Sequence, residues 1–314
     1  MEAPLLVVLA GGASSRLWPL EEKSLIKFMG RPLLSLQLER YAQLGMDRGV
    51  IVANPENEGV IRALVESLPE IEIEVVVQPE PRGMGDALLK MDGYLQRHGN
   101  QTIYITQVHD LTDIALHHDL LMAYQTGNAN AYLAGYRVSE YFPGGYLEVG
   151  ANGRITNIIE KPGAGSEPSD LVNIVAHVHS DAALLLDHIR AEYDRPETSD
   201  DHYERAMARM MERYVFQVVP YSGPWHAIKF PWHVLDVMQW MLSQIDEPQI
   251  APDAQIEEGV LIKGNVVMDS GARLFHGATV VPENVLGDVE VPPHCHAQLQ
   301  AALSQLAAER QRSG

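Results

Sequence analysis

A glycine-rich turn near the amino terminus carries two basic residues whose types and spacing suit phosphate chemistry. The segment LAGGASSRLWPLEEKSL, residues 9–25, contains Gly11, Gly12, Arg16 and Lys23 directly after an apolar run. Glycines let backbone N–H groups approach a phosphate closely, and Arg and Lys add cationic donors. It is not a P-loop, because no Gly-Lys-Ser/Thr closes it. We predict a nucleotide phosphate site; the alternative is an ordinary strand-to-helix turn with solvated basic residues.

A second segment suits the recognition of a base. QPEPRGMGDA, residues 78–87, lies between an expected strand and an expected helix. The side-chain amide of Gln78 can both donate and accept hydrogen bonds, which suits the edge of a pyrimidine. Gly83 leaves room for a base to lie on the backbone. The alternative is a solvent-facing Gln in a proline-rich turn.

An acidic residue at the end of a later strand is a candidate metal ligand. Asp110 lies in QVHDLTD, residues 107–113, after the expected strand 102–106. Mg²⁺ prefers carboxylate oxygens and substrate phosphates, so an Asp beside a triphosphate is chemically apt. Asp113 is the alternative ligand, or the cap of the next helix. We favour Asp110.

These candidates follow segments that alternate between strand and helix patterns. Short apolar runs predict strands at 5–9, 50–53, 73–77 and 102–106, and helices at 32–44, 55–68 and 84–96. Such alternation favours a parallel sheet with helices on both faces, which binds ligands beyond the carboxyl ends of its strands. A hairpin is predicted at 144–159 around an Asn-Gly turn, followed by helices ending near 214 and 245.

The tail follows a different period. Aliphatic residues recur at every sixth position from Ile250 to Leu286. This period is typical of hexapeptide coils and predicts a short left-handed parallel β-helix, followed by a capping helix at 297–310. We therefore predict two domains, a catalytic domain over 1–245 and the β-helix with its C-terminal helix over 246–314.

Composition restricts the function classes. The 314 residues include 23 basic and 42 acidic side chains, a net charge of −19, whereas nucleic-acid binders usually show a basic face. A polyanionic small substrate would need a local basic cluster and a divalent metal. The apolar runs are too short to cross a bilayer. The one cysteine, Cys295, and the absence of a basic leader lead us to expect a cytoplasmic protein.

The first segment resembles the signature of the sugar-phosphate nucleotidylyltransferases, in which Gly-Gly-x-x-x-Arg-Leu-x-Pro-Leu precedes Lys-x-Leu and Gly-x-Pro. The spacing from Arg16 to Lys23 is similar to that of the N-acetylglucosamine-1-phosphate uridylyltransferases and shorter than that of the thymidylyltransferases. The resemblance implies a Rossmann-like mixed α/β sheet. It also implies that Gly11, Gly12 and Arg16 hold the nucleotide phosphates, while Lys23 contacts the α-phosphate or the departing pyrophosphate.

The same resemblance assigns the base and metal residues. It implies that Gln78 and Gly83 contact uracil or thymine and that Asp110 binds Mg²⁺. Two positions depart from the family pattern: Met84 stands where Thr is frequent, and His109 stands where Gly precedes the Asp.

Three later matches concern the sugar. The resemblance implies that Gly145 begins a strand near the sugar and that Asn173 contacts it. Glu160 and Lys161, in a Glu-Lys-Pro run, correspond to residues that bind the sugar hydroxyls and the sugar phosphate. Val175 replaces a usual Gly, which would narrow the pocket.

One departure affects the metal. The family often reads Trp-x-Asp-x-Gly-x-Pro, in which the Asp is a second metal ligand, whereas this chain reads WHAIKFPW at 225–232. Ala227 therefore stands at the ligand position and cannot bind a metal. His226 is one residue away and would face the other side of a strand. Lys229 would bring positive charge where a metal is missing.

The residues and the resemblance together predict transfer of a nucleotidyl group from UTP or dTTP to a sugar-1-phosphate. Arg16, Lys23, Lys161 and Mg²⁺ would neutralise charge. The run SRLWPL is also similar to mannose-1-phosphate guanylyltransferases. The alternatives are a non-catalytic sugar-nucleotide-binding regulatory subunit and a bifunctional enzyme with an acyltransferase in the tail. For the tail we favour assembly into a homo-oligomer.

Overall fold

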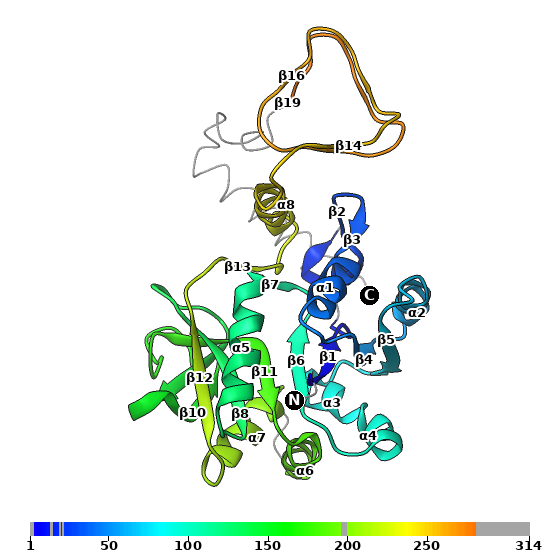
Figure 1. Cartoon of the computed structure of the whole chain (residues 1–314). Coiled ribbons are helices and arrows are strands. Elements are labelled where there is room, and N and C mark those ends of the chain that lie inside the picture. The colour runs from blue at the N-terminus through cyan, green and yellow to red at the C-terminus, as the bar shows by residue number, and fades with distance from the viewer. Residues whose placement is uncertain (1–2, 13–14, 19, 21, 196–199, 281–314) are drawn as a thin grey trace, which may run out of the picture. The chain divides into compact units, whose positions relative to one another are not determined.

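The chain forms two compact units, seen here in a computed structural model that describes residues 3–12, 15–18, 20, 22–195 and 200–280 (Figure 1). The first unit comprises Met1–Ala13 and Leu33–Ala227, and the second comprises Ser14–Pro32 and Ile228–Gly314. The boundary between these compact units lies after Ala227, and the second unit also includes Ser14–Pro32. The division into functional domains at 245/246 stays a prediction. Leu286 and the expected capping helix at 297–310 lie outside the described residues.

A nine-stranded mixed sheet forms the centre of the first unit, in agreement with the mixed α/β sheet that the resemblance implies. Its order is β5-β4-β1-β6-β11-β8-β12-β10-β9. The pairs among β5, β4, β1 and β6 are parallel, whereas β11 runs antiparallel to both β6 and β8. The strands are β1 (Leu5–Leu9), β4 (Arg48–Ala53), β5 (Glu72–Val77), β6 (Ile103–Gln107), β8 (Ala131–Arg137), β9 (Gly145–Val149), β10 (Arg154–Glu160), β11 (Leu171–His179) and β12 (Phe216–Tyr221).

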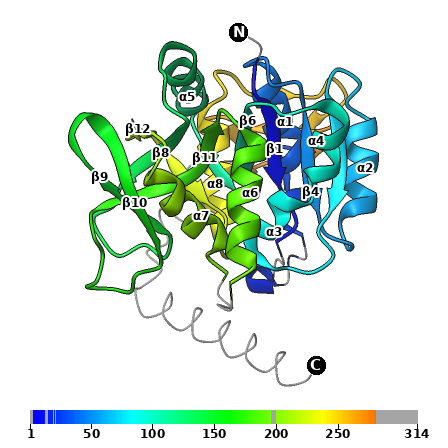
Figure 2. The ribbon, with the colours of Figure 1, turned by 90° about the horizontal axis from the view of Figure 1, so that it is seen from below.

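Helices cover both faces of this sheet, because alternate residues of each buried strand point to opposite sides. On one face Leu5, Val7 and Leu9 of β1 join a core built with α3 (Gly83–Leu89), α4 (Asp92–His98), α6 (Ala182–Tyr193) and α7 (His202–Met211). Figure 2 shows α6 and α7 in front of β8 and β11. On the other face Tyr104 and Thr106 of β6 contact α5 (Ile114–Thr126) and α1 (Leu33–Ala42) through His117 and Tyr41. Helix α2 (Glu58–Glu66) packs beside β5.

One predicted helix is divided in two. The sequence favours a single helix over 84–96, but α3 ends at Leu89 and α4 begins at Asp92. Met91 lies between them and is fully buried, in the same core as Tyr94 and Leu95. The break lets all three side chains reach the core, so tertiary packing overrides local helix preference.

Within its described residues, the second unit contains two short helical turns, a two-stranded hairpin, one longer helix and six very short strands. In chain order these are η1 (Ser15–Leu17), η2 (Lys23–Leu25), β2 (Lys27–Phe28), β3 (Arg31–Pro32), α8 (His233–Ser243), β14 (Gln249–Ile250), β15 (Gln255–Ile256), β16 (Leu261–Ile262), β17 (Val267–Met268), β18 (Arg273–Leu274) and β19 (Thr279–Val280).

The six strands of the tail repeat at the predicted spacing. They pair in parallel as β14–β17, β15–β18 and β16–β19, and every pair joins residues 18 positions apart, such as Gln249 with Val267. The chain thus follows a three-sided path twice, seen as a triangle in Figure 1. The aliphatic residues of the six-residue period stand second in each strand. The handedness of the coil and its continuation past Val280 stay predictions.

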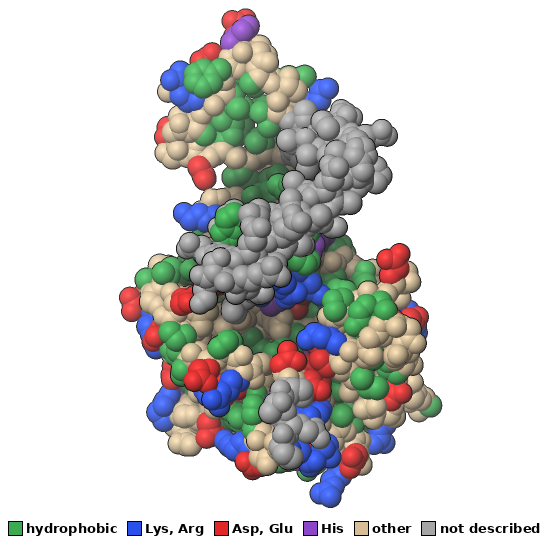
Figure 3. Space-filling model, turned by 180° about the vertical axis from the view of Figure 1, so that it is seen from behind, with side chains coloured by type: hydrophobic (Ala, Val, Ile, Leu, Met, Phe, Trp, Pro, Cys, Tyr) green, Lys and Arg blue, Asp and Glu red, His purple; other side chains and the backbone are tan. Residues whose placement is uncertain are grey.

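The surface and the helices bear on possible partners. On the face drawn in Figure 3, acidic and basic side chains are interspersed. Across the part of the chain that the structure describes, none of the helices combines the length and apolar character that crossing a bilayer requires.

Candidate functional site

The glycine-rich turn begins at the carboxyl end of β1, in the middle of the parallel strands. Its start is fixed because the Ala10 N–H donates to Val52 O at 2.8 Å and Asn57 Nδ2 donates to Ala10 O at 2.9 Å. A Cβ at Gly11 would lie 3.1 Å from Gln78 Oε1 and 3.3 Å from Ala53 O. Gly11 therefore borders Gln78 directly, whereas Gly12 is exposed.

Gln78 lies just past β5 and is only 5% exposed. The nitrogen of its side-chain amide donates two hydrogen bonds. Its Nε2 donates to Gly83 O at 3.1 Å and to Asp86 Oδ2 at 2.9 Å. Asp86 Oδ1 in turn binds Lys90 Nζ at 2.9 Å. The sequence reading names Gln78 and Gly83 but misses Asp86, whose only sequence signal is the i,i+4 spacing to Lys90.

Tyr193 of α6 holds the loop that carries these groups. Its hydroxyl donates to Arg82 O at 2.8 Å and accepts from the Asp86 N–H at 2.8 Å. The ring stacks on His202, with centroids 3.9 Å apart. Burial raises the pKa of Tyr193, so the hydroxyl keeps its proton and the loop is tied at both ends.

Asp200 connects this cluster to the predicted sugar residues. Gly83 has a φ of +86°, and a Cβ there would lie 2.9 Å from Asp200 O. The Asp200 carboxylate lies 3.7 Å from Lys161 Nζ. The base-side and sugar-side residues are therefore neighbours, although 78 positions separate Gly83 from Lys161 in the chain.

The sugar-side residues meet where β9, β10 and β11 adjoin. A Cβ at Gly145 would lie 2.5 Å from Asn173 Oδ1 and 3.2 Å from Glu160 Oε2. Glu160 Oε1 binds Lys161 Nζ at 3.0 Å. Lys161 has a φ of +45°, in the left-handed region that non-glycine residues rarely adopt. Such strain concentrates at functional sites, and all four predicted residues are brought together here.

A chain of buried polar groups lies behind Asn173. Its Nδ2 is 3.2 Å from His177 Nε2, and the Tyr203 hydroxyl is 2.8 Å from His177 Nδ1 and 3.1 Å from His179 Nε2. Burial lowers the pKa of each histidine to about 3, so both are neutral and join the chain without charge. The sequence reading misses these residues, although a His-x-His spacing on one strand places both rings on one face.

Glu204 of α7 is a further buried group near this cluster, and it is 3% exposed. Burial, with a smaller contribution from the nearby Glu160, raises the pKa of its carboxyl from 4.5 to about 8, although Lys161 opposes the shift. Between these two values the folded state holds a proton that the unfolded chain releases. Stability attributable to this group is therefore lost as the pH rises from about 4.5 to 8.

We expect Glu204→Gln to be more stable than the wild type at pH 8, with a difference that shrinks toward pH 5. The amide keeps the shape of the protonated carboxyl and has no charge to bury. Urea unfolding across that pH range measures it, with Glu212→Gln, an exposed residue just past the same helix, as the control. An unchanged pH slope in Glu204→Gln would contradict this assignment.

Asp110 lies opposite Ala227 in a separate two-stranded sheet. It begins β7 (Asp110–Thr112), which pairs antiparallel with β13 (Trp225–Ala227) in a register that aligns Ala227 with Asp110. Asp110 is 8% exposed, and Trp225 Nε1 lies 3.4 Å from its Oδ1. Side chains directly opposite in such a pair have Cβ atoms about 4.5–5.5 Å apart. Ala227, the position at which the resemblance predicts a second Asp, therefore adjoins Asp110.

Gln37 of α1 positions the turn before Asp110. It is almost fully buried, and its Nε2 lies 3.4 Å from both Val108 O and Asp110 O. Asp113, the alternative ligand, occupies the N-cap position of α5 with extended backbone, but its side chain makes no capping hydrogen bond.

The donors around Asp110 limit how a metal would be held. Among the described residues, groups of three or more His, Cys, Asp and Glu arranged to hold a metal ion are not found. Mg²⁺ commonly binds through one or two carboxylates together with substrate phosphates and waters. One buried carboxylate therefore fits an ion that arrives with a triphosphate.

Arg16 and Lys23 belong to the second unit. Arg16 lies in η1, exposed, with its Cζ 6.0 Å from the centroid of the Phe230 ring. Lys23 begins η2, whose N-cap residue Glu22 accepts a hydrogen bond from the Ser24 N–H at 3.0 Å. Lys229, which we considered as a replacement for metal charge, also lies in this unit.

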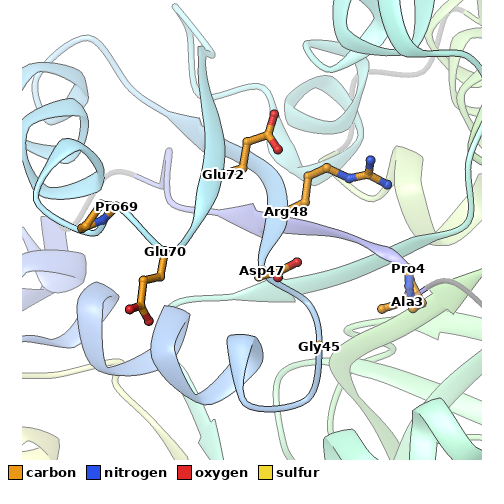
Figure 4. Close-up of a pocket in the computed structure, with 8 residues that line it drawn as sticks. All are labelled: Ala3, Pro4, Gly45, Asp47, Arg48, Pro69, Glu70 and Glu72. Atoms are coloured by element: carbon orange, nitrogen blue, oxygen red, sulfur yellow. The ribbon is translucent and has the colours of Figure 1, made fainter.

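A pocket of about 380 Å³ lies elsewhere, at the other end of the parallel strands (Figure 4). It is lined by Ala3, Pro4, Gly45, Asp47, Arg48, Pro69, Glu70 and Glu72. None of the predicted site residues lines it, and ligands of such sheets bind at the carboxyl ends of the strands.

Known proteins are similar to this chain in sequence or in fold. The chain is 27% identical over 283 residues to a bifunctional sugar-1-phosphate nucleotidylyltransferase/acetyltransferase of Sulfurisphaera tokodaii, covering 87% of this chain but only 64% of that protein. It is 24% identical to mannose-1-phosphate guanylyltransferase 1 of Arabidopsis thaliana over 97% of this chain and 81% of that protein. An apo UDP-glucose pyrophosphorylase structure matches with a TM-score of 0.64 and 16% identity, covering 77% of this chain and 99% of that one.

The most direct comparison is with a family as a whole. The family model described as nucleotidyl transferase matches residues 5–226, a range that begins at β1 and ends in β13. It spans the glycine-rich turn, the Gln78 cluster, the sugar-side residues and Asp110, and covers well over half of the sequence. The chain belongs to the nucleotidyl transferase family.

Proposed function

We propose that this protein transfers a nucleotidyl group from a nucleoside triphosphate, with UTP or dTTP favoured, to a sugar-1-phosphate. The products are a nucleoside-diphosphate sugar and pyrophosphate. The observation that carries the proposal is the junction at Asp200, which lies against Gly83 on one side and near Lys161 on the other. A base-binding loop and a sugar-binding cluster that share one residue suit a reaction joining a nucleotide to a sugar phosphate.

The reaction needs positioning and charge neutralisation rather than a covalent protein intermediate. An oxygen of the sugar-1-phosphate attacks the α-phosphorus, the bond to the bridging oxygen of the β-phosphate breaks, and pyrophosphate leaves with those electrons. Lys161 would hold the sugar phosphate, while Glu160 and Asn173 would bind sugar hydroxyls. The Gly11–Gly12 backbone, Arg16 and Lys23 would hold the triphosphate. Alignment of the two reactants supplies much of the rate enhancement in such reactions.

Metal use is part of the proposal. The family generally uses a divalent metal ion, and we propose Mg²⁺ held by Asp110. When bound it would supply positive charge to the triphosphate. The low exposure of Asp110 and its place on a short strand fixed by Gln37 support this role.

A regulatory subunit that binds nucleotide sugars without turning them over is the second candidate. The small, non-coordinating Ala227 opposite Asp110 favours it. The retained, buried Asp110 favours the enzyme, because a protein that only binds nucleotide sugars does not need a ligand for the metal that accompanies a triphosphate.

A panel of nucleoside triphosphates against sugar-1-phosphates separates the two candidates. We expect pyrophosphate release with at least one sugar phosphate and with UTP or dTTP. Calorimetry of the same nucleotides and of nucleotide sugars runs beside it. Binding without release across the panel would assign the protein to the regulatory class.

For the tail we propose a short left-handed β-helix that assembles the chain into a homo-oligomer. Apolar side chains on its coils are exposed in the single chain, with Ile250 and Ile256 at 42% and Phe275 at 61%. We also propose a cytoplasmic location, which the single Cys295 suits.

Truncation before Ile250 should lower the oligomeric state and leave the sheet domain folded, because each coil of a solenoid packs mainly on its neighbours. Sedimentation of the full-length and truncated proteins gives the number of protomers, and circular dichroism confirms folding. An unchanged number of protomers per particle would exclude the assembly role.

A further inference from the structure

The amide of Gln78 is held in one orientation, and the group that holds it is Asp86. Both Nε2 protons of Gln78 are engaged, one by Gly83 O at 3.1 Å and one by Asp86 Oδ2 at 2.9 Å. The reverse orientation would place the amide oxygen against two other oxygens, which repel it. Gln78 is 5% exposed and Asp86 8%, so water does not offset that repulsion.

Lys90 maintains the acceptor character of Asp86. Its Nζ lies 2.9 Å from Asp86 Oδ1, so the carboxylate is paired on the side away from Gln78. Tyr193 holds the Asp86 backbone through its N–H at 2.8 Å. The Asp86 carboxylate is therefore held in position beside the Gln78 amide, and Lys90 balances its negative charge.

The remaining face of the amide is its oxygen, which lies against the glycine-rich turn. A Cβ at Gly11 would lie only 3.1 Å from Oε1, so a side chain at this position would crowd the amide oxygen. A base that approaches this oxygen meets a hydrogen-bond acceptor, because both N–H groups of the same amide are already engaged. The matching partner is a ring N–H.

We infer that Asp86 is a specificity-determining positioning residue, which fixes Gln78 as an acceptor and restricts the protein to bases with a ring N–H. This deepens the proposed function and rests on its assignment of Gln78 to the base. Uracil and thymine carry this group at N3 and guanine carries it at N1, whereas cytosine and adenine carry a bare acceptor nitrogen at the equivalent edge. UTP, dTTP and GTP would bind, and CTP and ATP would be rejected.

Asp86→Asn tests the inference. The Asn side chain can either donate or accept a hydrogen bond. The Gln78 amide can therefore rotate and present its N–H groups to a base. We expect the ratio of kcat/KM for UTP to that for CTP to fall about tenfold or more, with the KM for the sugar phosphate unchanged. Lys90→Gln should lower the same ratio by less. Asp92→Asn, which removes a carboxylate paired with Arg190 rather than with Gln78, should leave it unchanged.

The outcomes separate this inference from the proposed function. If wild-type protein releases no pyrophosphate, calorimetry with UTP, GTP, CTP and ATP still measures the preference and its loss in Asp86→Asn. An equal loss for all four nucleotides, or a wild type that prefers CTP or ATP, would overturn the inference. Should Asp86→Asn fail to fold, the ratio in Lys90→Gln decides, and an unchanged ratio there would also overturn it.

Discussion

We expect Asp110→Asn to lower turnover by roughly 100- to 1,000-fold, which is the usual loss when one charge-stabilising group is removed from an active site. Asn keeps the size of the side chain and its contact with Trp225 but removes the negative charge that attracts a divalent ion. Pyrophosphate release at saturating substrates and several Mg²⁺ concentrations measures the loss. Excess Mg²⁺ should recover only part of it.

Two companion variants sharpen this result. Ala227→Asp places a second carboxylate directly across the strand pair from Asp110, so we expect turnover to be kept or raised and less Mg²⁺ to be needed. Asp113→Asn serves as the matched control, because Asp113 is the N-cap residue of α5. Turnover that survives Asp110→Asn but not Asp113→Asn would move the metal site to Asp113.

Gly145→Ala is the second variant with a large expected effect. The new methyl group would lie 2.5 Å from Asn173 Oδ1 and 3.2 Å from Glu160 Oε2, and real Cβ atoms essentially never come within 3.0 Å of another heavy atom. Neither side chain moves freely, because Asn173 contacts His177 and Glu160 is paired with Lys161. We expect the KM for the sugar phosphate to rise about 10- to 100-fold, or ~1.4–2.8 kcal/mol, while the KM for the nucleotide changes little.

Gly150→Ala is the control for that experiment. It adds the same methyl group at the far end of the same hairpin, where the nearest atom, Thr156 Cγ2, lies 3.6 Å away. It should leave both KM values unchanged. If Gly145→Ala raises the KM of the nucleotide as much as that of the sugar phosphate, the cluster does not bind the sugar.

The positions of several predicted site residues relative to the strands were readable from the sequence, because each of these residues follows the end of a strand, whereas their functional roles stay predictions. Gln78 after β5, Lys161 after β10 and the turn after β1 are local features, readable from an apolar run followed by Gly, Pro or a polar group. The strands themselves were predictable for the same reason, since β1 is five consecutive buried aliphatic residues.

The residues that the sequence reading missed depend on distant segments. Asp86 has its proposed role only because the Gln78 amide donates a hydrogen bond to it. The row of buried polar groups behind Asn173 includes Tyr203, which comes from a helix that starts 29 positions later. The alignment of Ala227 with Asp110 joins segments 117 positions apart. Local patterns carry no information about such pairings, because topology and register decide them.

The divided helix has the same origin. Residues 84–96 include Gly85 and Gly93, which weaken helix propensity, and the burial of Met91 between the two helices accounts for the position of the break. A burial requirement of this kind is set by the neighbouring helices rather than by the segment itself.

The 18-residue spacing between paired strands of the tail limits how its length can change. Deleting six residues keeps the aliphatic period but moves every later residue to the next side of the triangle, so surface residues beyond the deletion turn by about one third of a revolution. Deleting 18 residues restores each side to its original direction and shortens the stack by one layer. Length variation among tails of this kind should therefore occur freely in whole circuits, whereas a change of one hexapeptide redirects everything that follows it.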